Sequence, residues 1–279
     1  MSTDDIMVPA LCSVTFRSLS VEELIPLARE NGVKAIEWGA DVHVPLGQLG
    51  RARQVAALCK DQDIDAASYG SYVRAGDPAA IEQFSQALDT AQALGAGNIR
   101  VWAGRRLPED YNAAERQGIA ADLHRMADDA SGQGITVSIE FHRNTLTQRV
   151  QDAVVLLEEA NHPNLFSYWQ PVPDRPLQTR LEEMTALAPW LGHVHVFHWI
   201  PVEDQDERRP LSEGRDLWQP MMNNWTTAPH WPHPRLAMLE FVANDDIEQF
   251  RKDMHTLRKL CTACPTHPSP PHGERETTP

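Results

Sequence analysis

Val137-Ser138-Ile139-Glu140-Phe141-His142 and Ala237-Met238-Leu239-Glu240-Phe241-Val242 are two short apolar runs that each carry a glutamate near the end. Both have the length and composition of a buried strand and then pass into polar sequence. A carboxylate in such a place is costly unless it is ion-paired or bound to a metal ion. A third run of this kind, His193-Val194-His195-Val196-Phe197-His198, lies between them. We therefore expect the two glutamates and His195 to converge on one site.

Strand-like and helix-like segments alternate along the rest of the chain. The expected strands are residues 9–15, 34–38, 64–69, 98–102, 135–141, 165–169, 193–199 and 236–242. The expected helices are residues 20–32, 46–61, 78–94, 113–131, 148–161, 177–187 and 246–261. Eight such units in one domain predict a (β/α)8 TIM barrel of the α/β class, which we expect to span residues 1–262.

Local signals mark several helix ends. Ser20 and Glu23 have the spacing of a capping box, and Asp77-Pro78 supplies an N-cap residue followed by an N1 proline. The acidic run Asn244-Asp245-Asp246 is expected to cap the last helix.

Two segments depart from the repeat. The connection over residues 201–234 is long and rich in Trp, Pro and Arg, and long loops in compact domains are usually functional. The tail over residues 263–279 is rich in Pro, Ser, Thr and Gly, which predicts disorder. Cys261 and Cys264 have C-x-x-C spacing, which we interpret as an incidental pair because no second pair accompanies it.

Composition narrows the classes of partner. The 39 acidic and 25 basic residues give a formal net charge of −14, which disfavours nucleic acid and anionic membranes as partners. We find no apolar run long enough to span a membrane and no signal peptide, and four cysteines are too few for a disulfide framework. These features predict a cytoplasmic protein and leave homo-oligomerisation open.

Strand alternation predicts which side chains share the interior of the barrel. Glu140, Gln170, His195 and Glu240 fall at matching heights at the C-terminal strand ends, where TIM-barrel active sites lie. Two carboxylates, an imidazole and an amide oxygen suit a divalent ion such as Mn, Mg, Co or Zn. The alternatives are ion-paired glutamates and a Gln170 that orients a substrate hydroxyl. His193 fits a hydrogen-bonded core histidine better than a ligand.

Three further segments, together with the strand ends that carry Glu140, His195 and Glu240, produce a resemblance to a known family. They are Ile36-Glu37-Trp38-Gly39-Ala40-Asp41-Val42-His43-Val44-Pro45, Ser68-Tyr69-Gly70-Ser71-Tyr72 and Ile99-Arg100-Val101-Trp102-Ala103-Gly104. With them the chain resembles, over residues 8–260, the sugar phosphate isomerase/epimerase family of xylose-isomerase-like TIM barrels, which is related to the apurinic endonucleases of the endonuclease IV type. The endonuclease branch is disfavoured, because residues 68–72 contain no histidine for a zinc cluster and the net charge is negative.

The resemblance implies a metal ion held by Glu140, Gln170, His195 and Glu240. Family members carry an aspartate where this chain has Gln170, and often Lys-Asp where it has Phe197-His198. The exchange of acid for amide removes one negative charge, which should weaken metal binding or change its preference. The resemblance further implies that Glu140 and Glu240 are an acid/base pair that moves a proton through an enediolate.

Several other residues are candidates for substrate contact. Glu37 and His142 could hold substrate hydroxyls, and His43 lies in the first of the family segments. Trp38, Trp102 and Trp169 stand near strand ends, where an indole face can pack against sugar C–H groups or, alternatively, against the helices. Arg209, in the long connection, could close over the substrate or be an ordinary surface residue.

The favoured hypothesis is a metal-dependent isomerase or epimerase acting on a small sugar, ketose or polyol-like substrate. No Gly-rich phosphate site follows the last strands, which favours an unphosphorylated substrate. The rival enzyme is a dehydratase of the inosose type, in which the same enolate expels a β-hydroxyl. The non-enzymatic alternative is a barrel that has lost its metal and only binds a sugar-like ligand.

Overall fold

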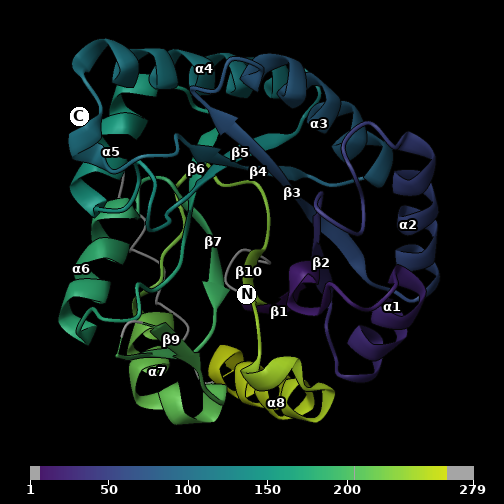
Figure 1. The fold of residues 1–279 in the computed structure, drawn as a ribbon. Coiled ribbons are helices and arrows are strands. Elements are labelled where there is room, and N and C mark those ends of the chain that lie inside the picture. Colours follow the sequence, from purple (N-terminus) through teal and green to yellow (C-terminus); the bar gives the residue numbers. More distant parts are fainter. Residues whose placement is uncertain (1–6, 204, 263–279) are drawn as a thin grey trace, which may run out of the picture.

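The protein is a closed barrel of eight parallel strands surrounded by helices, shown by a computed structural model that describes residues 7–203 and 205–262 (Figure 1). The strand order around the barrel is β1-β10-β7-β6-β5-β4-β3-β2, and neighbouring strands run parallel. The barrel strands are β1 (Met7–Cys12), β2 (Ala35–Gly39), β3 (Asp65–Ala75), β4 (Asn98–Ala103), β5 (Thr136–Glu140), β6 (Leu165–Trp169), β7 (Leu191–Val196) and β10 (Arg235–Leu239). This confirms the predicted (β/α)8 class. The predicted disordered tail over residues 263–279 lies outside the described residues.

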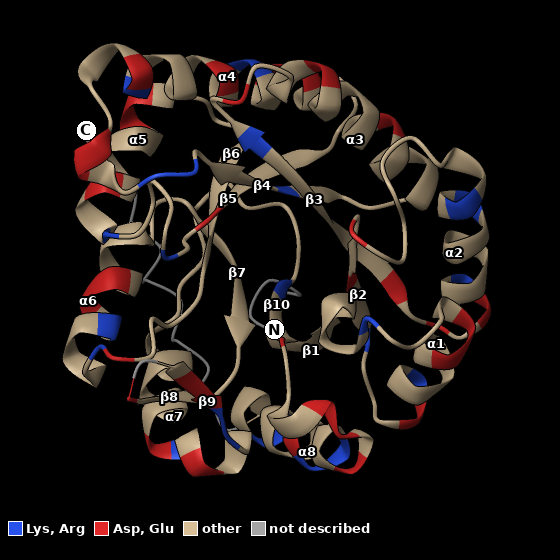
Figure 2. Ribbon diagram, in the orientation of Figure 1, with Lys and Arg blue, Asp and Glu red and all other residues tan. Residues whose placement is uncertain are grey.

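The helices cover the outside of the barrel. They are α1 (Val21–Glu30), α2 (Leu49–Asp61), α3 (Ala80–Leu94), α4 (Ala113–Ser131), α5 (Val150–Ala160), α6 (Leu177–Leu187), α7 (Arg215–Asn224) and α8 (Ile247–Thr262), with short 3-10 segments Ser13–Phe16, Pro108–Asp110, Leu211–Gly214 and Ala243–Asp245. One large hydrophobic cluster fills the space between strands and helices, and a smaller one that includes Ala10, Cys12 and Met238 lies inside the barrel. Acidic and basic residues are interspersed on the outer helices (Figure 2).

Most helix ends follow the local signals. The side chain of Ser20 accepts from the backbone N–H of Glu23, and Glu23 accepts in return, so the capping box is confirmed. Asp246 accepts from the N–H of Glu248 at 2.6 Å and so caps α8 as expected. The N-cap prediction for Asp77 is wrong: α3 begins only at Ala80, and the Asp77 carboxylate pairs with Arg105 instead.

The connection over residues 201–234 contains regular structure of its own. The two-stranded hairpin of β8 (Trp199–Val202) and β9 (Gln205–Arg208) follows β7, and α7 follows the hairpin. The expected seventh strand, residues 193–199, therefore stops earlier, at Val196, and Trp199 belongs to the hairpin.

No helix in the described part of the chain is long and apolar enough to cross a membrane.

The end of this connection closes the base of the barrel. The ring of Trp231 packs edge-on against Phe166 at 4.8 Å and against His193 at 4.7 Å between centroids. His193 is fully buried and its Nδ1 accepts from the backbone N–H of Leu236, which agrees with the expected core histidine. Gly192 leaves the necessary room, because a Cβ on this residue would stand 2.7 Å from the Trp231 indole.

We expect Gly192→Ala to lower the free energy of unfolding by about 1–3 kcal/mol, because the methyl group collides with the Trp231 ring, which Phe166 and His193 hold in place. Urea unfolding followed by circular dichroism measures the loss. The matched control is Gly118→Ala in α4, where a Cβ meets nothing within 4 Å. The control should change stability by no more than about 1 kcal/mol, in the stabilising direction. Equal effects of the two substitutions would contradict this account of the barrel base.

Candidate active site

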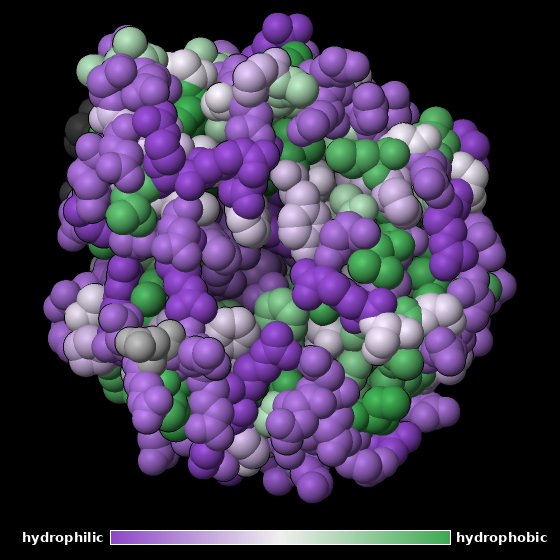
Figure 3. Space-filling view, viewed as in Figure 1, coloured by the Kyte–Doolittle hydropathy of each residue, from purple (hydrophilic) through white to green (hydrophobic). Residues whose placement is uncertain are grey.

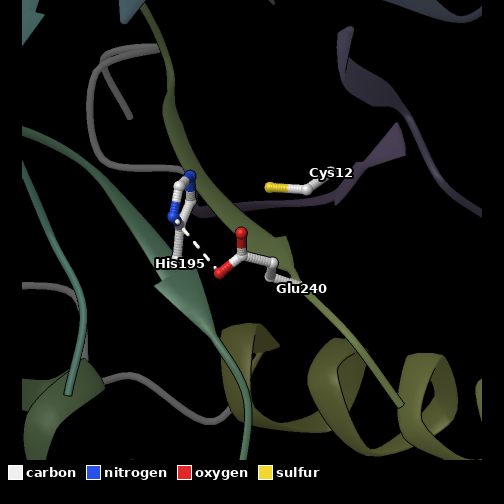
Figure 4. Close-up of side chains that lie close together, drawn as sticks. All are labelled: Cys12, His195 and Glu240. Atoms are coloured by element: carbon white, nitrogen blue, oxygen red, sulfur yellow. Dashed lines mark ion pairs between the residues drawn. The ribbon is translucent and has the colours of Figure 1, made fainter. Parts of the chain in front are cut away.

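The predicted strand ends do converge. His195 Nδ1 lies 3.6 Å from Glu140 Oε1, 3.6 Å from Glu240 Oε2 and 3.2 Å from Gln170 Oε1. His195 is fully buried, and the other three residues are no more than 8 % exposed. These four side chains come from β5, β7 and the first residues after β6 and β10, so the barrel brings together the expected set at its C-terminal end (Figure 4 shows His195 and Glu240).

Backbone contacts fix the two glutamates at their strand ends. The carbonyl of Glu140 accepts from the Thr147 hydroxyl at 2.7 Å, and the N–H of Glu240 donates to the Val196 carbonyl at 3.0 Å. The next residue, Phe241, has a φ of 56°, in the left-handed region that is strained for a bulky side chain. Its N–H donates to the Thr15 hydroxyl at 3.1 Å, which holds the turn directly beyond Glu240.

The sequence interpretation missed Arg100, which organises the charges of the site. Its Nε lies 2.9 Å from Glu37 Oε1, and its Nη1 is ion-paired with Glu140 Oε2, with all three side chains buried. Gly70 makes room for the guanidinium, since a Cβ there would stand 2.6 Å from Arg100 Nη2. Strand alternation could have found Arg100, because Trp102, two residues on, was already expected at the site.

Burial and neighbouring charges act against each other on every ionisable group here. Burial opposes ionisation of Glu37, but Arg100 and His195 outweigh it and hold its pKa at about 2. The same balance lowers the pKa of Glu140, whereas burial prevails for Glu240 and raises its pKa. Burial alone would lower the pKa of His195, but its neighbours Cys12, Glu240 and Glu140 raise it well above its usual value.

The donor set fits a divalent cation. In the metal-free site, the raised pKa values of His195 and Glu240 favour retained protons that offset part of the carboxylate charge. When the imidazole is neutral and all three carboxylates are ionised, as binding of a metal ion requires, Glu37, Glu140 and Glu240 exceed the guanidinium of Arg100 by two negative charges in a buried site. Such an excess is unfavourable without a cation. His195 Nε2 is buried and has no hydrogen-bond partner among the described residues; its nearest carboxylate oxygen is Glu37 Oε1 at 3.6 Å. The residues present therefore suit a metal ion.

A cavity of about 310 Å³ opens over these groups and is lined by Glu240, Gln170, His142, Phe197, Trp199 and neighbours. His142 stacks on Trp102 with ring centroids 4.6 Å apart, and the Trp102 indole N–H donates to Glu140. Trp102 thus connects His142, in the wall of the cavity, to the buried carboxylate of Glu140. On the face that Figure 3 shows, hydrophilic residues predominate, with small hydrophobic areas between them.

His142 lines this cavity, and the other six expected substrate contacts do not. Glu37 pairs with Arg100, and the Trp102 indole bonds Glu140. Trp38 and Trp169 are fully buried in the cluster between strands and helices. Both ring nitrogens of His43 lie 3.1 Å from oxygens of neighbouring loops, so its polar atoms are already engaged. Arg209 is a surface residue that pairs with two glutamates near the hairpin.

A family model described as a xylose isomerase-like TIM barrel matches residues 25–260, and the chain belongs to this family. It is 26 % identical over 200 residues to a 3-dehydroshikimate dehydratase of Bacillus anthracis, which covers 67 % of this chain and 70 % of that one.

Solved structures share the fold. A probable 3-DHS dehydratase of Bacillus anthracis has a TM-score of 0.75 at 20 % identity, covering 90 % of this chain and 99 % of that one. A xylose isomerase-like TIM barrel protein of Mycobacterium smegmatis in complex with magnesium has a TM-score of 0.70 at 15 % identity, covering 94 % and 98 %. A D-allulose 3-epimerase of Methylomonas sp. has a TM-score of 0.67 at 16 % identity, covering 93 % and 100 %. The chain's relatives with a named activity among these are enzymes.

We expect Arg100→Met to lower the free energy of unfolding of the metal-free protein by about 3–5 kcal/mol, because it leaves two buried carboxylates unpaired. Adding Glu37→Gln in the same chain should recover part of this loss. Urea titration measures both. Arg105→Met is the control: Arg105 pairs with Asp77 with 63 % of its side chain exposed, and its loss should cost no more than about 1 kcal/mol. A similarly small effect at Arg100 would show that the buried carboxylates do not depend on it.

Proposed function

We propose that this protein is a divalent-metal-dependent dehydratase of a small, unphosphorylated polyhydroxylated ketone. It would remove a proton next to the carbonyl and expel the β-hydroxyl as water. The observation that carries the proposal is the asymmetry of the site: Glu140 is tied to Arg100 and Trp102, whereas His142 and Glu240 line the cavity. Elimination can use one group that takes the carbon-bound proton and passes it on, while epimerisation needs proton donors on two faces of the same carbon.

The metal ion would be held by Glu140, His195 and Glu240, with Gln170 beside them. When bound, it would polarise the substrate carbonyl and stabilise the negative charge that develops on its oxygen. Glu140 would use Oε1 for this, because its Oε2 accepts from Arg100 and Trp102. Arg100 and Trp102 therefore act as positioning residues for a ligand.

His142 is the group that we assign to proton transfer. Its Nδ1 contacts the backbone carbonyl of Arg143, and a carbonyl can only accept, so in the neutral form of the ring the proton lies on Nδ1. This leaves a lone pair on Nε2, which is the form of imidazole that a general base requires. Stacking on Trp102 fixes the ring plane.

The proton balance is simple. His142 Nε2 takes the proton as the C–H bond breaks, a C=C bond forms next to the carbonyl, and the C–O bond of the β-hydroxyl breaks. The imidazolium returns its proton to the departing hydroxyl, which leaves as water. The likeness to a 3-dehydroshikimate dehydratase of Bacillus anthracis supports this reaction class.

A metal-dependent isomerase or epimerase is the second candidate. Glu140 and Glu240 both approach the His195 imidazole to 3.6 Å from different strands, which is the arrangement that a two-carboxylate proton exchange would use. The fold likeness to the D-allulose 3-epimerase of Methylomonas sp. is compatible with it. In this reaction Glu140 would have to exchange protons despite its contact with Arg100.

The test incubates the metal-loaded protein in D₂O with 3-dehydroshikimate and, separately, with unphosphorylated ketohexoses, followed by NMR. We expect loss of water and a conjugated product. His142→Gln should lower the rate by about 10²–10⁴-fold with unchanged metal content, and Glu240→Gln should lose both activity and metal. His124→Gln is the control, since His124 lies on α4 and bonds the Ala160 carbonyl. Incorporation of deuterium into a ketose without dehydration would favour the epimerase. If neither reaction is observed, the protein would be a barrel that only binds a ligand.

A further inference from the structure

A thiol stands beside the predicted metal ligands. Cys12 is the last residue of β1, is 1 % exposed and belongs to the cluster inside the barrel. One ligand atom each of Cys12, His195 and Glu240 lie within 4.8 Å of one another. Figure 4 shows the Cys12 sulfur pointing toward the space beside the imidazole and the Glu240 carboxylate.

A second observation concerns the Nε2 atom of the same imidazole, whose Nδ1 is the nitrogen near Glu140, Glu240 and Gln170. His195 Nε2 is fully buried and has no hydrogen-bond partner among the described residues. Its approach to Glu37 Oε1, at 3.6 Å, is too long for a hydrogen bond. Buried polar atoms in folded proteins are nearly always satisfied, and a group left over is commonly explained by an ion or water.

The donor types at the site give a reason for the thiol. Gln170 supplies a neutral amide oxygen on the β6 side of His195, and an amide is a weak metal ligand. A thiolate from β1 would supply a stronger donor on the β1 side of the barrel. Gln170 would then be free to orient a substrate hydroxyl.

We propose that Cys12 is a thiolate ligand of the active-site metal, together with His195 and Glu240, and that the metal is Zn²⁺ or Co²⁺ rather than Mg²⁺. The inference rests on the proposed function in that it concerns the same ion. With bonds of about 2.3 Å from zinc to sulfur and about 2.0–2.2 Å to nitrogen or oxygen, the ligand atoms of a tetrahedral site lie roughly 3.6 Å apart, so those of Cys12, His195 and Glu240, within 4.8 Å of one another, would have to approach by about 1 Å. The present spacing requires only small side-chain movements. Thiolate and imidazole together select zinc-like ions over magnesium.

The thiol is inert until an ion arrives. Burial raises the pKa of Cys12 to about 12, so the sulfur is protonated in the metal-free protein. On coordination the S–H bond breaks, the sulfur–metal bond forms and the proton passes to solvent. Cys59 offers a matched comparison, because it is equally buried but lies on α2, in the cluster outside the barrel.

The experiment uses the full chain, stripped with a chelator and titrated with Co²⁺, Zn²⁺, Mn²⁺ or Mg²⁺ alone. We expect Co²⁺ to produce a thiolate-to-cobalt charge-transfer band in the wild-type protein, in Cys59→Ser and in the double variant Cys261→Ser/Cys264→Ser. The band should be absent from Cys12→Ser and Cys12→Ala. Zinc affinity, from competition with a chromophoric chelator, should fall at least tenfold in both Cys12 variants, while manganese affinity should change less than threefold. Circular dichroism confirms that each variant is folded.

The outcomes separate the two proposals. Cobalt binding to the wild-type protein without the charge-transfer band overturns the role of Cys12 and leaves the metal-dependent function standing. A band that survives in Cys12→Ser but disappears from the Cys261/Cys264 variant places the thiolate elsewhere and also overturns it. Binding of none of the four ions by the wild-type protein overturns this inference and the metal-dependent function together.

Discussion

Excess negative charge inside the barrel is the constraint on which the rest of the site depends. Glu37, Glu140 and Glu240 are all buried, and Arg100 is the one guanidinium in direct contact with two of them. Taking such groups out of water is unfavourable unless they are paired, so each must be held by a partner. Arg100 compensates two carboxylates through a forked contact, and His195 stands among all three. The remaining negative charge of the ionised carboxylates supports our proposal of a divalent cation at this site.

This arrangement also places Glu140 and Glu240, which have the same side-chain chemistry, in different surroundings. Glu140 is fixed by a cation and an indole and is suited to orientation and ligation, whereas Glu240 faces the cavity. His142 is held in one tautomer by a backbone carbonyl and in one plane by Trp102. Two carboxylates that look equivalent in the sequence are therefore unequal in the fold. That inequality is why we favour elimination over a symmetric exchange of protons.

The barrel and the convergence of Glu140, His195 and Glu240 could be predicted from sequence, because alternation and the common height of strand ends are local properties. The same alternation could have separated the tryptophans: Trp38 follows the inward-facing Glu37 and Trp169 precedes Gln170, so both point outward. Trp102 lies two residues after Arg100 on the same face of β4 and points inward. Alternation places Arg100 on the face of Trp102, but its pairing with Glu37 and Glu140 joins residues of three strands, which no local pattern shows. The approach of Cys12 to His195 and Glu240 likewise joins residues far apart in the sequence.

The connection between β7 and β10 contacts both ends of the barrel. Trp199 of the hairpin lines the cavity at the C-terminal end, while Trp231 fills the base against Phe166 and His193. A single stretch of chain thus contributes to the cavity with its first portion and to the packing of the barrel base with its last portion. Replacing residues 199–208 with a different hairpin would change the lining of the cavity and leave the packing of Trp231 at the barrel base intact. Exchanging the whole connection for that of a relative would replace Trp231 at the barrel base together with Trp199 at the cavity. A chimera that is meant to change only the cavity should therefore keep the segment that follows β9.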